Sequence, residues 1–185
     1  MMRNLKIFNS ENSALLIIDI QEKILPVIYQ SERVIENTIK LIKGFKTLNA
    51  PVYFTEQYPK GLGRTDEKIK DALGENEPIE KMSFSCRGGG NLFMELRDNG
   101  IEQVALCGVE SHVCVMQTAL DLVANGFQVH VAADAVSSRR ELDYKAALDR
   151  MRANDIEITL TESILFEMLN VCGTEQFKTI SKLVK

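Results

Sequence analysis

Three residue types in this sequence could together carry out thiol-based hydrolysis. They are the carboxylate of Asp19, the ammonium of Lys81 and the thiol of Cys114. A thiol must lose its proton before it attacks a carbonyl carbon. Asp19 could accept that proton as a general base, while Lys81 and a helix N-terminus would favour the thiolate. The three residues therefore predict a cysteine nucleophile with its own base, provided that the fold brings them together.

Each of these residues also has a simpler explanation. An Asp after a strand is often a turn residue or a helix cap. A single Lys is usually solvated, and a single Cys is more often part of a core than a nucleophile. The catalytic hypothesis therefore depends on the elements that position Asp19, Lys81 and Cys114.

The chain alternates short apolar runs with segments of helical periodicity. Strands are expected at 14–19, 51–56, 78–81, 104–108, 127–134 and 156–160. Helices are expected at 32–48, 66–73, 91–100, 112–125, 141–153 and 174–184. This alternation predicts parallel βαβ units in the α/β class, arranged as a doubly wound, three-layer αβα sandwich. The length predicts a single domain over residues 1–185.

The three chemical residues all fall at ends of expected strands. Asp19 ends the first strand, Lys81 ends the strand at 78–81, and Cys114 lies in the first turn of the helix that follows 104–108. Ligands of doubly wound sheets bind beyond the carboxyl ends of the strands, where the strand order reverses. The sequence therefore predicts one site at that edge. Ser111 is expected to cap the helix that carries Cys114.

Composition argues against several other functions. The net charge of −4 gives no basic surface for nucleic acid or anionic lipid. No apolar stretch is long enough for a bilayer, and the N-terminus lacks a secretory pattern, so we expect a cytoplasmic protein. The four cysteines form no CxxC pair and the chain has only two His, so neither a metal site nor a cofactor is expected.

Four segments of the sequence together resemble the isochorismatase-like superfamily of cysteine hydrolases. They are ALLIIDIQ, KMSFS, LCGVESHVCVMQTALDL and VHVAADAVSSR, and the resemblance covers roughly residues 12–160. The segment TEQYPKGLG at 55–63 is similar to the subgroup of small isochorismatase domain-containing proteins, which are related to the nicotinamidases.

This resemblance implies a six-stranded, mainly parallel sheet and an Asp-Lys-Cys triad at Asp19, Lys81 and Cys114. It also implies homo-oligomers and a cis peptide bond between Val109 and Glu110. A Cys at the nucleophile position implies cleavage of an amide or related C–N bond rather than of a vinyl ether. The nicotinamidases hold a metal through an Asp and two His after the second strand, whereas the matching segment here contains no His.

Further site residues are predicted from their positions near the triad in the sequence. Backbone N–H groups of Glu110 and Cys114 are expected to form an oxyanion hole. His112 is two residues from Cys114 and so is poorly placed to be its base. Side chains expected to contact substrate are Gln21, Tyr58, Phe84 and His112. Packing or capping would explain each of them equally well.

The sequence thus predicts a hydrolase that attacks a small-molecule amide through a thioester intermediate. Two alternatives stay open: an isochorismatase-type hydrolase without a covalent intermediate, and a binding or assembly module without enzymatic activity. A third hypothesis is a redox thiol, for which Cys86 could approach Cys114 in space. His130 is expected to be a packed histidine, and Asp134 and Arg139 are expected to have structural roles.

Overall fold

A computed structural model describes residues 3–185. Its centre is one sheet of six parallel strands in the order β3-β2-β1-β4-β5-β6. The strands are β1 (Ser13–Ile18), β2 (Val52–Gln57), β3 (Ile79–Lys81), β4 (Gln103–Val109), β5 (Gln128–Ser137) and β6 (Glu157–Thr159). Each of the six predicted strands overlaps one of these, and the predicted parallel sheet is confirmed.

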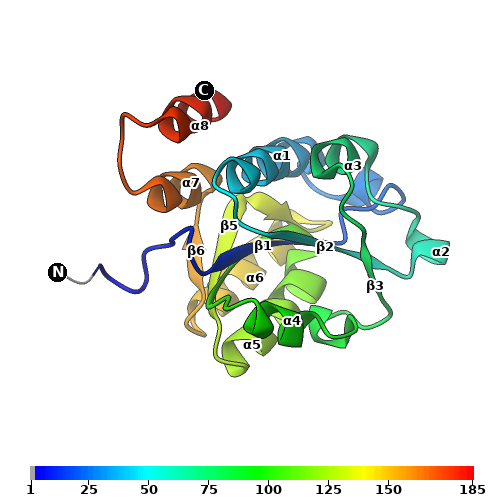
Figure 1. Ribbon diagram of the computed structural model, residues 1–185. Helices are drawn as coiled ribbons and strands as arrows, with labels where there is room; N and C mark the ends of the chain where they lie inside the picture. Colours follow the sequence, from blue (N-terminus) through cyan, green and yellow to red (C-terminus); the bar gives the residue numbers. More distant parts are fainter. Residues whose placement is uncertain (1–2) are drawn as a thin grey trace.

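Helices cover both faces of the sheet and complete the predicted three layers (Figure 1). The face packed on the longest helix carries α1 (Ser31–Thr47), α3 (Glu67–Leu73), α7 (Thr161–Leu169) and α8 (Glu175–Leu183). The opposite face carries α4 (Leu92–Asp98), α5 (Met116–Ala124) and α6 (Glu141–Arg152). A short helix, α2 (Pro59–Leu62), lies beyond the end of β2.

Strand β1 shows why its sequence forms the middle of such a sheet. Leu15 and Ile17 pack into the apolar cluster under α1, while Leu16 and Ile18 pack into the cluster under α5. A strand that is buried on both faces requires a continuous apolar run rather than an alternating one. Strand β1 therefore runs through the interior and delivers the residue that follows Ile18 to the edge of the sheet.

The strand order reverses between β1 and β4. The chain builds β1, β2 and β3 in one direction and then returns to place β4 on the other side of β1. Gly108 permits the close contact between these two strands, because a Cβ there would lie 2.2 Å from the backbone oxygen of Ile18. Its φ of +136° is also a conformation that favours glycine. The crevice at this reversal is the expected ligand position.

Three helical regions differ from the prediction, and one of them is the short helix α2, which was not predicted. Helix α7 was not predicted, because its N-terminus is capped from a distant strand: Asp134 Oδ1 accepts hydrogen bonds from the N–H and the hydroxyl of Thr161 at 2.8 and 2.9 Å. This contact confirms a structural role for Asp134. The helix predicted at 112–125 begins instead as a π-helical turn, Ser111–Val115, and continues as α5. No helix within residues 3–185 has the length and apolar character needed to cross a membrane.

Candidate active site

The carboxyl ends of β1, β2 and β3 bring a carboxylate and an ammonium into contact. Lys81 Nζ lies 2.7 Å from Asp19 Oδ2, and the two side chains are 0% and 4% exposed. The ammonium also donates to the backbone oxygens of Ser83 and Phe84 at 3.1 and 3.0 Å. Thr55 donates its hydroxyl to Asp19 Oδ1 at 2.7 Å. Hydrogen bonds on every side thus hold this buried ion pair in one arrangement.

The thiol of Cys114 joins this cluster through a glutamine. Cys114 is 4% exposed, and its Sγ donates to Gln57 Oε1 at 3.1 Å. The same Oε1 accepts from Lys81 Nζ at 3.2 Å. The structure therefore brings Asp19, Lys81 and Cys114 to one place, as the sequence predicts. In this resting arrangement the thiol proton is directed toward Gln57, and the carboxylate of Asp19 is occupied by Thr55 and Lys81.

The charge state of the thiol differs from the expectation. Burial raises the pKa of Cys114 well above its ordinary value, the negative charge of Asp19 raises it further, and Lys81 only partly opposes them. The sulfur is therefore protonated at neutral pH. Lys81 alone does not create a standing thiolate, because Asp19 neutralises it at 2.7 Å. A thiolate must form when a substrate arrives and the proton is transferred.

The residues that directly follow β1, β2 and β4 share an unusual backbone conformation. Asp19, Tyr58 and Glu110 have φ of +54°, +40° and +60°. Non-glycine residues adopt such angles rarely, and those that do cluster at functional sites. At each strand end the left-handed residue turns the chain sharply away from its strand.

Two predictions about the nucleophile turn are wrong. The described residues contain no cis peptide bond, so Val109 and Glu110 are joined in trans, and the left-handed Glu110 makes the turn instead. Ser111 is not the cap, because Glu110 occupies that position without a capping side-chain bond, while Ser111 Oγ is buried without a partner. Arg139 holds the Glu110 carboxylate by two hydrogen bonds of 3.1 and 2.9 Å, which is the structural role expected for Arg139.

The residues predicted to contact substrate lie in different environments. Gln21 is fully buried, and its amide binds the backbone of Gln57 on both sides: Oε1 accepts from Gln57 N at 2.8 Å and Nε2 donates to Gln57 O at 3.1 Å. Gln21 therefore fastens the backbone of β2. Tyr58 and Phe84 are exposed next to Lys81, with Tyr58 N donating to Lys81 O at 3.0 Å. His112 is half-buried, and its Nδ1 lies 3.0 Å from Ser138 Oγ.

Sequence reasoning missed Thr55 and Gln57, which contact Asp19 and Cys114 directly. Both belong to the last residues of β2 and point to the same face of the sheet, since side chains alternate along a strand. Gln57 is paired with Lys81 across β2 and β3. The strand-end criterion that selected Asp19 and Lys81 would have found Gln57 as well, had it been applied to polar, uncharged residues.

A cavity borders β3 next to the cluster, although neither Asp19 nor Cys114 lines it and the Lys81 side chain is 0% exposed. It has a volume of about 320 Å³ and is lined by Pro59, Glu80, Lys81, Met82, Ser83 and Gly88. The exposed side chains of Met82 and Phe84 lie on the same segment of chain as this cavity.

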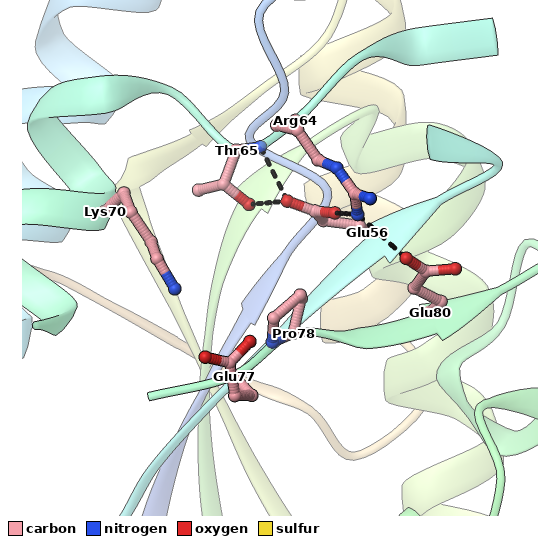
Figure 2. Close-up of a pocket in the computed structure, with 7 residues that line it drawn as sticks. All are labelled: Glu56, Arg64, Thr65, Lys70, Glu77, Pro78 and Glu80. Carbon is pink, nitrogen blue, oxygen red and sulfur yellow. Dashed lines mark hydrogen bonds and ion pairs between the residues drawn. The ribbon is translucent and has the colours of Figure 1, made fainter. Parts of the chain in front are cut away.

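The opposite face of the same two strands carries a second polar cluster (Figure 2). Glu56 accepts from the N–H and the hydroxyl of Thr65 at 2.7 and 2.8 Å, and Arg64 Nη1 bridges Glu56 and Glu80 at 2.8 Å each. Burial acts to raise the pKa of Glu56, but the bonds from Arg64 and Thr65 outweigh it and lower that pKa. This cluster borders a hollow of about 680 Å³, which Lys70, Glu77 and Pro78 also line.

The remaining titratable groups offer no further centre. Within residues 3–185, no three His, Cys, Asp or Glu side chains are grouped so that they could hold a metal ion. Cys86 is fully buried near the site, and burial raises the pKa of its thiol to about 11. His130 is buried against Phe8, and burial lowers its pKa to about 4, as befits the packed histidine that was predicted.

Comparison with known proteins identifies the family. Residues 13–163 match the isochorismatase domain, which is most of the chain. The chain belongs to the isochorismatase family. It is 38% identical over 178 residues to isochorismatase domain-containing protein 2 of Danio rerio, with 95% of this chain and 88% of that protein covered. This relative confirms the resemblance to the small isochorismatase domain-containing proteins.

Two further similar proteins carry more specific descriptions. The secreted isochorismatase effector Isc1 of Phytophthora sojae is 38% identical over 179 residues, covering 94% of this chain and 85% of that protein. The solved structure described as MAR1 ribonuclease from Caenorhabditis elegans is 37% identical, covers 96% of this chain and 91% of that chain, and has a TM-score of 0.89. The sheet and its covering helices are therefore those of the family.

Proposed function

We propose that this isochorismatase-family protein is a cysteine hydrolase that cleaves a small amide or related C–N bond through a thioester. One observation carries the proposal. The Cys114 thiol, the Lys81 ammonium and the Asp19 carboxylate belong to one hydrogen-bonded cluster at the point where the strand order reverses. A nucleophile, a cation and a base at that point are the elements of acyl transfer.

The first chemical step forms the thioester. The S–H bond of Cys114 turns from Gln57 toward Asp19, and the carboxylate of Asp19 accepts the proton. The sulfur lone pair then attacks the carbonyl carbon, and the carbonyl electrons move onto oxygen, where backbone N–H groups of Glu110 and Cys114 stabilise them. Lys81 opposes the negative charge that develops on sulfur. When the carbonyl re-forms, the C–N bond breaks and the departing nitrogen takes the proton from Asp19.

The second step returns the enzyme to its starting state. A water molecule gives a proton to Asp19 and attacks the thioester carbon. The C–S bond then breaks, the acid product leaves, and the sulfur recovers its proton from Asp19. A protonated resting thiol suits this cycle, because the site holds no reactive thiolate while it is empty.

The experiment is a screen of small amides, carbamates and imides with wild type, Cys114→Ala and Asp19→Asn assayed side by side. Each substitution should reduce turnover by a factor of about a hundred or more, because the Cys114 thiol and the Asp19 carboxylate both act in thioester formation and in its hydrolysis. A thioester should be detectable by mass spectrometry on the peptide that contains Cys114 after rapid acid quenching. Full turnover by Cys114→Ala would exclude a covalent mechanism and favour the alternative isochorismatase-type hydrolysis.

A second candidate activity comes from the relative described as a ribonuclease. The observation in its favour is 37% identity over nearly the whole chain. The net charge of −4 opposes it, since RNA binding depends on basic surface. Incubation of the protein with a labelled single-stranded RNA, with Cys114→Ala as control, tests it: cleavage by the wild type alone would make RNA the substrate.

We also propose that the protein acts in the cytoplasm as a homo-oligomer. Its cysteines within residues 3–185 are all free, which suits a reducing compartment. The exposed apolar side chains of Tyr58, Met82 and Phe84 would suit contact with a second copy. Light scattering on the purified protein measures its mass, and a monomer at assay concentration would contradict the oligomer.

A further inference from the structure

We propose that the hollow beside Glu56 and Arg64 is a binding site for a small zwitterion, a molecule that carries both a carboxylate and an ammonium group, as an amino acid does. Its volume of about 680 Å³ lies within the range of small-molecule sites. Glu56 and Glu80 face it from β2 and β3. The next residues, Gln57 and Lys81, face the catalytic cluster, because side chains alternate along a strand. The site is therefore separate from that cluster and adds a second ligand to the proposed function.

One wall of the hollow presents an ammonium without a carboxylate partner. Lys70 takes part in no ion pair within residues 3–185. Its Nζ donates to the backbone oxygen of Asn76 at 2.8 Å and lies 5.4 Å from the centre of the Phe54 ring. These contacts hold the ammonium in place and use one of its three hydrogens. The other two are available to an anion, and the side chain points into the hollow (Figure 2).

The segment that leads from α3 into β3 presents an unpaired carboxylate. Glu77 lines the same hollow and forms no ion pair in the described part of the chain. The preceding residue fixes its position, since Asn76 donates its side-chain N–H to Val52 O at 2.9 Å and accepts from Lys70. One hollow thus contains a cation and an anion that do not pair with each other (Figure 2).

The remaining wall is a fixed network whose charges do not cancel. Arg64 Nη1 bridges Glu56 and Glu80 at 2.8 Å each, so one cation meets two carboxylates. The Glu56 side chain is 3% exposed, and Thr65 binds it through both its N–H and its hydroxyl. Burial would raise the pKa of Glu56, but the bonds from Arg64 and Thr65 lower it, so this carboxylate is ionised at neutral pH. The wall is therefore held in place and adds a net negative charge to the hollow.

The arrangement of these charges defines the class of ligand. An anion alone would satisfy Lys70 but would meet the excess negative charge of the other walls. A cation alone would satisfy Glu77 but would be repelled by Lys70. A zwitterion places its carboxylate at Lys70 and its ammonium at Glu77, and it displaces water that would otherwise screen both pairs. Pro78 also lines the hollow and offers an apolar surface to the carbon chain that joins the two groups.

The test measures equilibrium binding by isothermal titration calorimetry. The ligands are the straight-chain ω-amino acids, which are glycine, β-alanine and their longer homologues. The member that binds most tightly is then compared with the alkylamine and with the alkanoic acid of the same chain length, each of which lacks one charge. Each should bind roughly tenfold more weakly or worse, the effect of one hydrogen bond between charged groups.

Two substitutions separate the two charges. Lys70→Met keeps an aliphatic stem over Phe54, so it should weaken binding of the zwitterion about tenfold without weakening that of the alkylamine. Glu77→Gln, at an exposed residue, should weaken the zwitterion by a similar factor without weakening the alkanoic acid. The matched controls are Lys68→Met and Glu75→Gln, exposed residues outside the hollow, and both should keep the wild-type dissociation constant.

The proposal is overturned if no member of the series binds at about 10 mM, or if either Lys70→Met or Glu77→Gln, once shown to be folded, binds the zwitterion as the controls do. Glu77→Gln decides the matter if Lys70→Met does not fold. Cys114→Ala should bind the zwitterion as the wild type does, and loss of binding there would place the ligand at the catalytic cluster instead. Failure on any of these grounds leaves the proposed hydrolase untouched.

Discussion

The two faces of the β2–β3 edge carry similar ion pairs in opposite surroundings. On one face Lys81 and Asp19 meet at 2.7 Å with side chains 0% and 4% exposed. On the other, Arg64 meets Glu56 at 2.8 Å, but the Arg64 side chain is 66% exposed (Figure 2). Successive residues of one strand supply the two faces, since Glu56 precedes Gln57 and Glu80 precedes Lys81.

The difference lies in what each pair does to its neighbours. Water screens the charge of Arg64, so the outer network mainly fastens the loop that carries Thr65 to the strand. Screening is weak around Asp19 and Lys81, so their charges act on the adjacent thiol. Burial, rather than the pairing itself, makes the charges of one cluster act on a neighbouring thiol and leaves the other cluster a structural role.

The largest expected effect comes from removing the inner cation. Lys81→Met leaves the carboxylate of Asp19 buried without a counter-charge, which should lower the free energy of unfolding by about 3–5 kcal/mol and abolish turnover. Urea unfolding at pH 7 measures the first effect, and the amide assay measures the second. Wild-type stability in this variant would mean that water reaches Asp19 and that the contrast between the two faces is false.

A buried titratable group whose ring Nε2 has no hydrogen-bond partner sharpens the comparison. His130 is 2% exposed, its Nε2 has no partner, and burial lowers its pKa to about 4 from an ordinary 6.5. As the pH falls below 6.5, His130 therefore becomes protonated in the unfolded chain but stays neutral in the folded chain. Stability should decline by about 3 kcal/mol between pH 7 and pH 4 through this group alone.

Urea unfolding across that pH range, in wild type and in His130→Leu, isolates this contribution. The substitution removes the titrating group and should flatten the part of the decline that begins near pH 6.5. If the free energy of unfolding fell equally with pH in wild type and His130→Leu down to pH 4, His130 would be protonated in the folded protein and would not be a desolvated group.

A smaller effect is expected at the outer cluster. Glu56→Gln places an amide against Arg64 and weakens the bonds to Thr65, which should cost about 1–3 kcal/mol of unfolding free energy at pH 7. Because the pKa of folded Glu56 lies below its ordinary value of 4.5, its contribution is present above that pH and is lost as the pH falls through the folded value. The gap between variant and wild type should therefore close in acid.

The matched control is Glu80→Gln, which alters the exposed ion pair between Arg64 and Glu80. This variant should leave the urea midpoint of unfolding unchanged within error. The alkylation rate of Cys114 in Glu56→Gln gives a second measurement. It should change far less than in Lys81→Met, and an equal change would contradict the separation between the faces.

Much of the fold could be predicted because its determinants are local. The apolar run of β1 and the periodicity of α1 each indicate their own element. Helix α7 could not be found in this way, since the cap for Thr161 comes from Asp134 on a neighbouring strand. The start of the nucleophile turn depends likewise on the left-handed Glu110, which Arg139 holds from outside the turn.

The candidate site was predictable to the extent that its residues are chemically distinctive. Asp19, Lys81 and Cys114 stand out by type and by their positions at strand ends. Gln57 does not, because glutamine is common on surfaces and its contact with the thiol arises only from pairing between β2 and β3. The charge state of Cys114 was mispredicted for the same kind of reason: the balance of burial, carboxylate and ammonium is a property of distances.

The contact at Gly108 has a consequence for how the site tolerates change. A methyl group at that position would lie 2.2 Å from the Ile18 carbonyl oxygen and would force β1 and β4 apart. Asp19 directly follows β1, and the turn that carries Cys114 follows β4. The separation between the Asp19 carboxylate and the Cys114 sulfur therefore depends on the main-chain packing of β1 against β4 at Gly108. Gly108→Ala could be accommodated only if β1 or β4 moved as a unit, because the added methyl group would clash with the backbone of Ile18 and not with a side chain that could change rotamer.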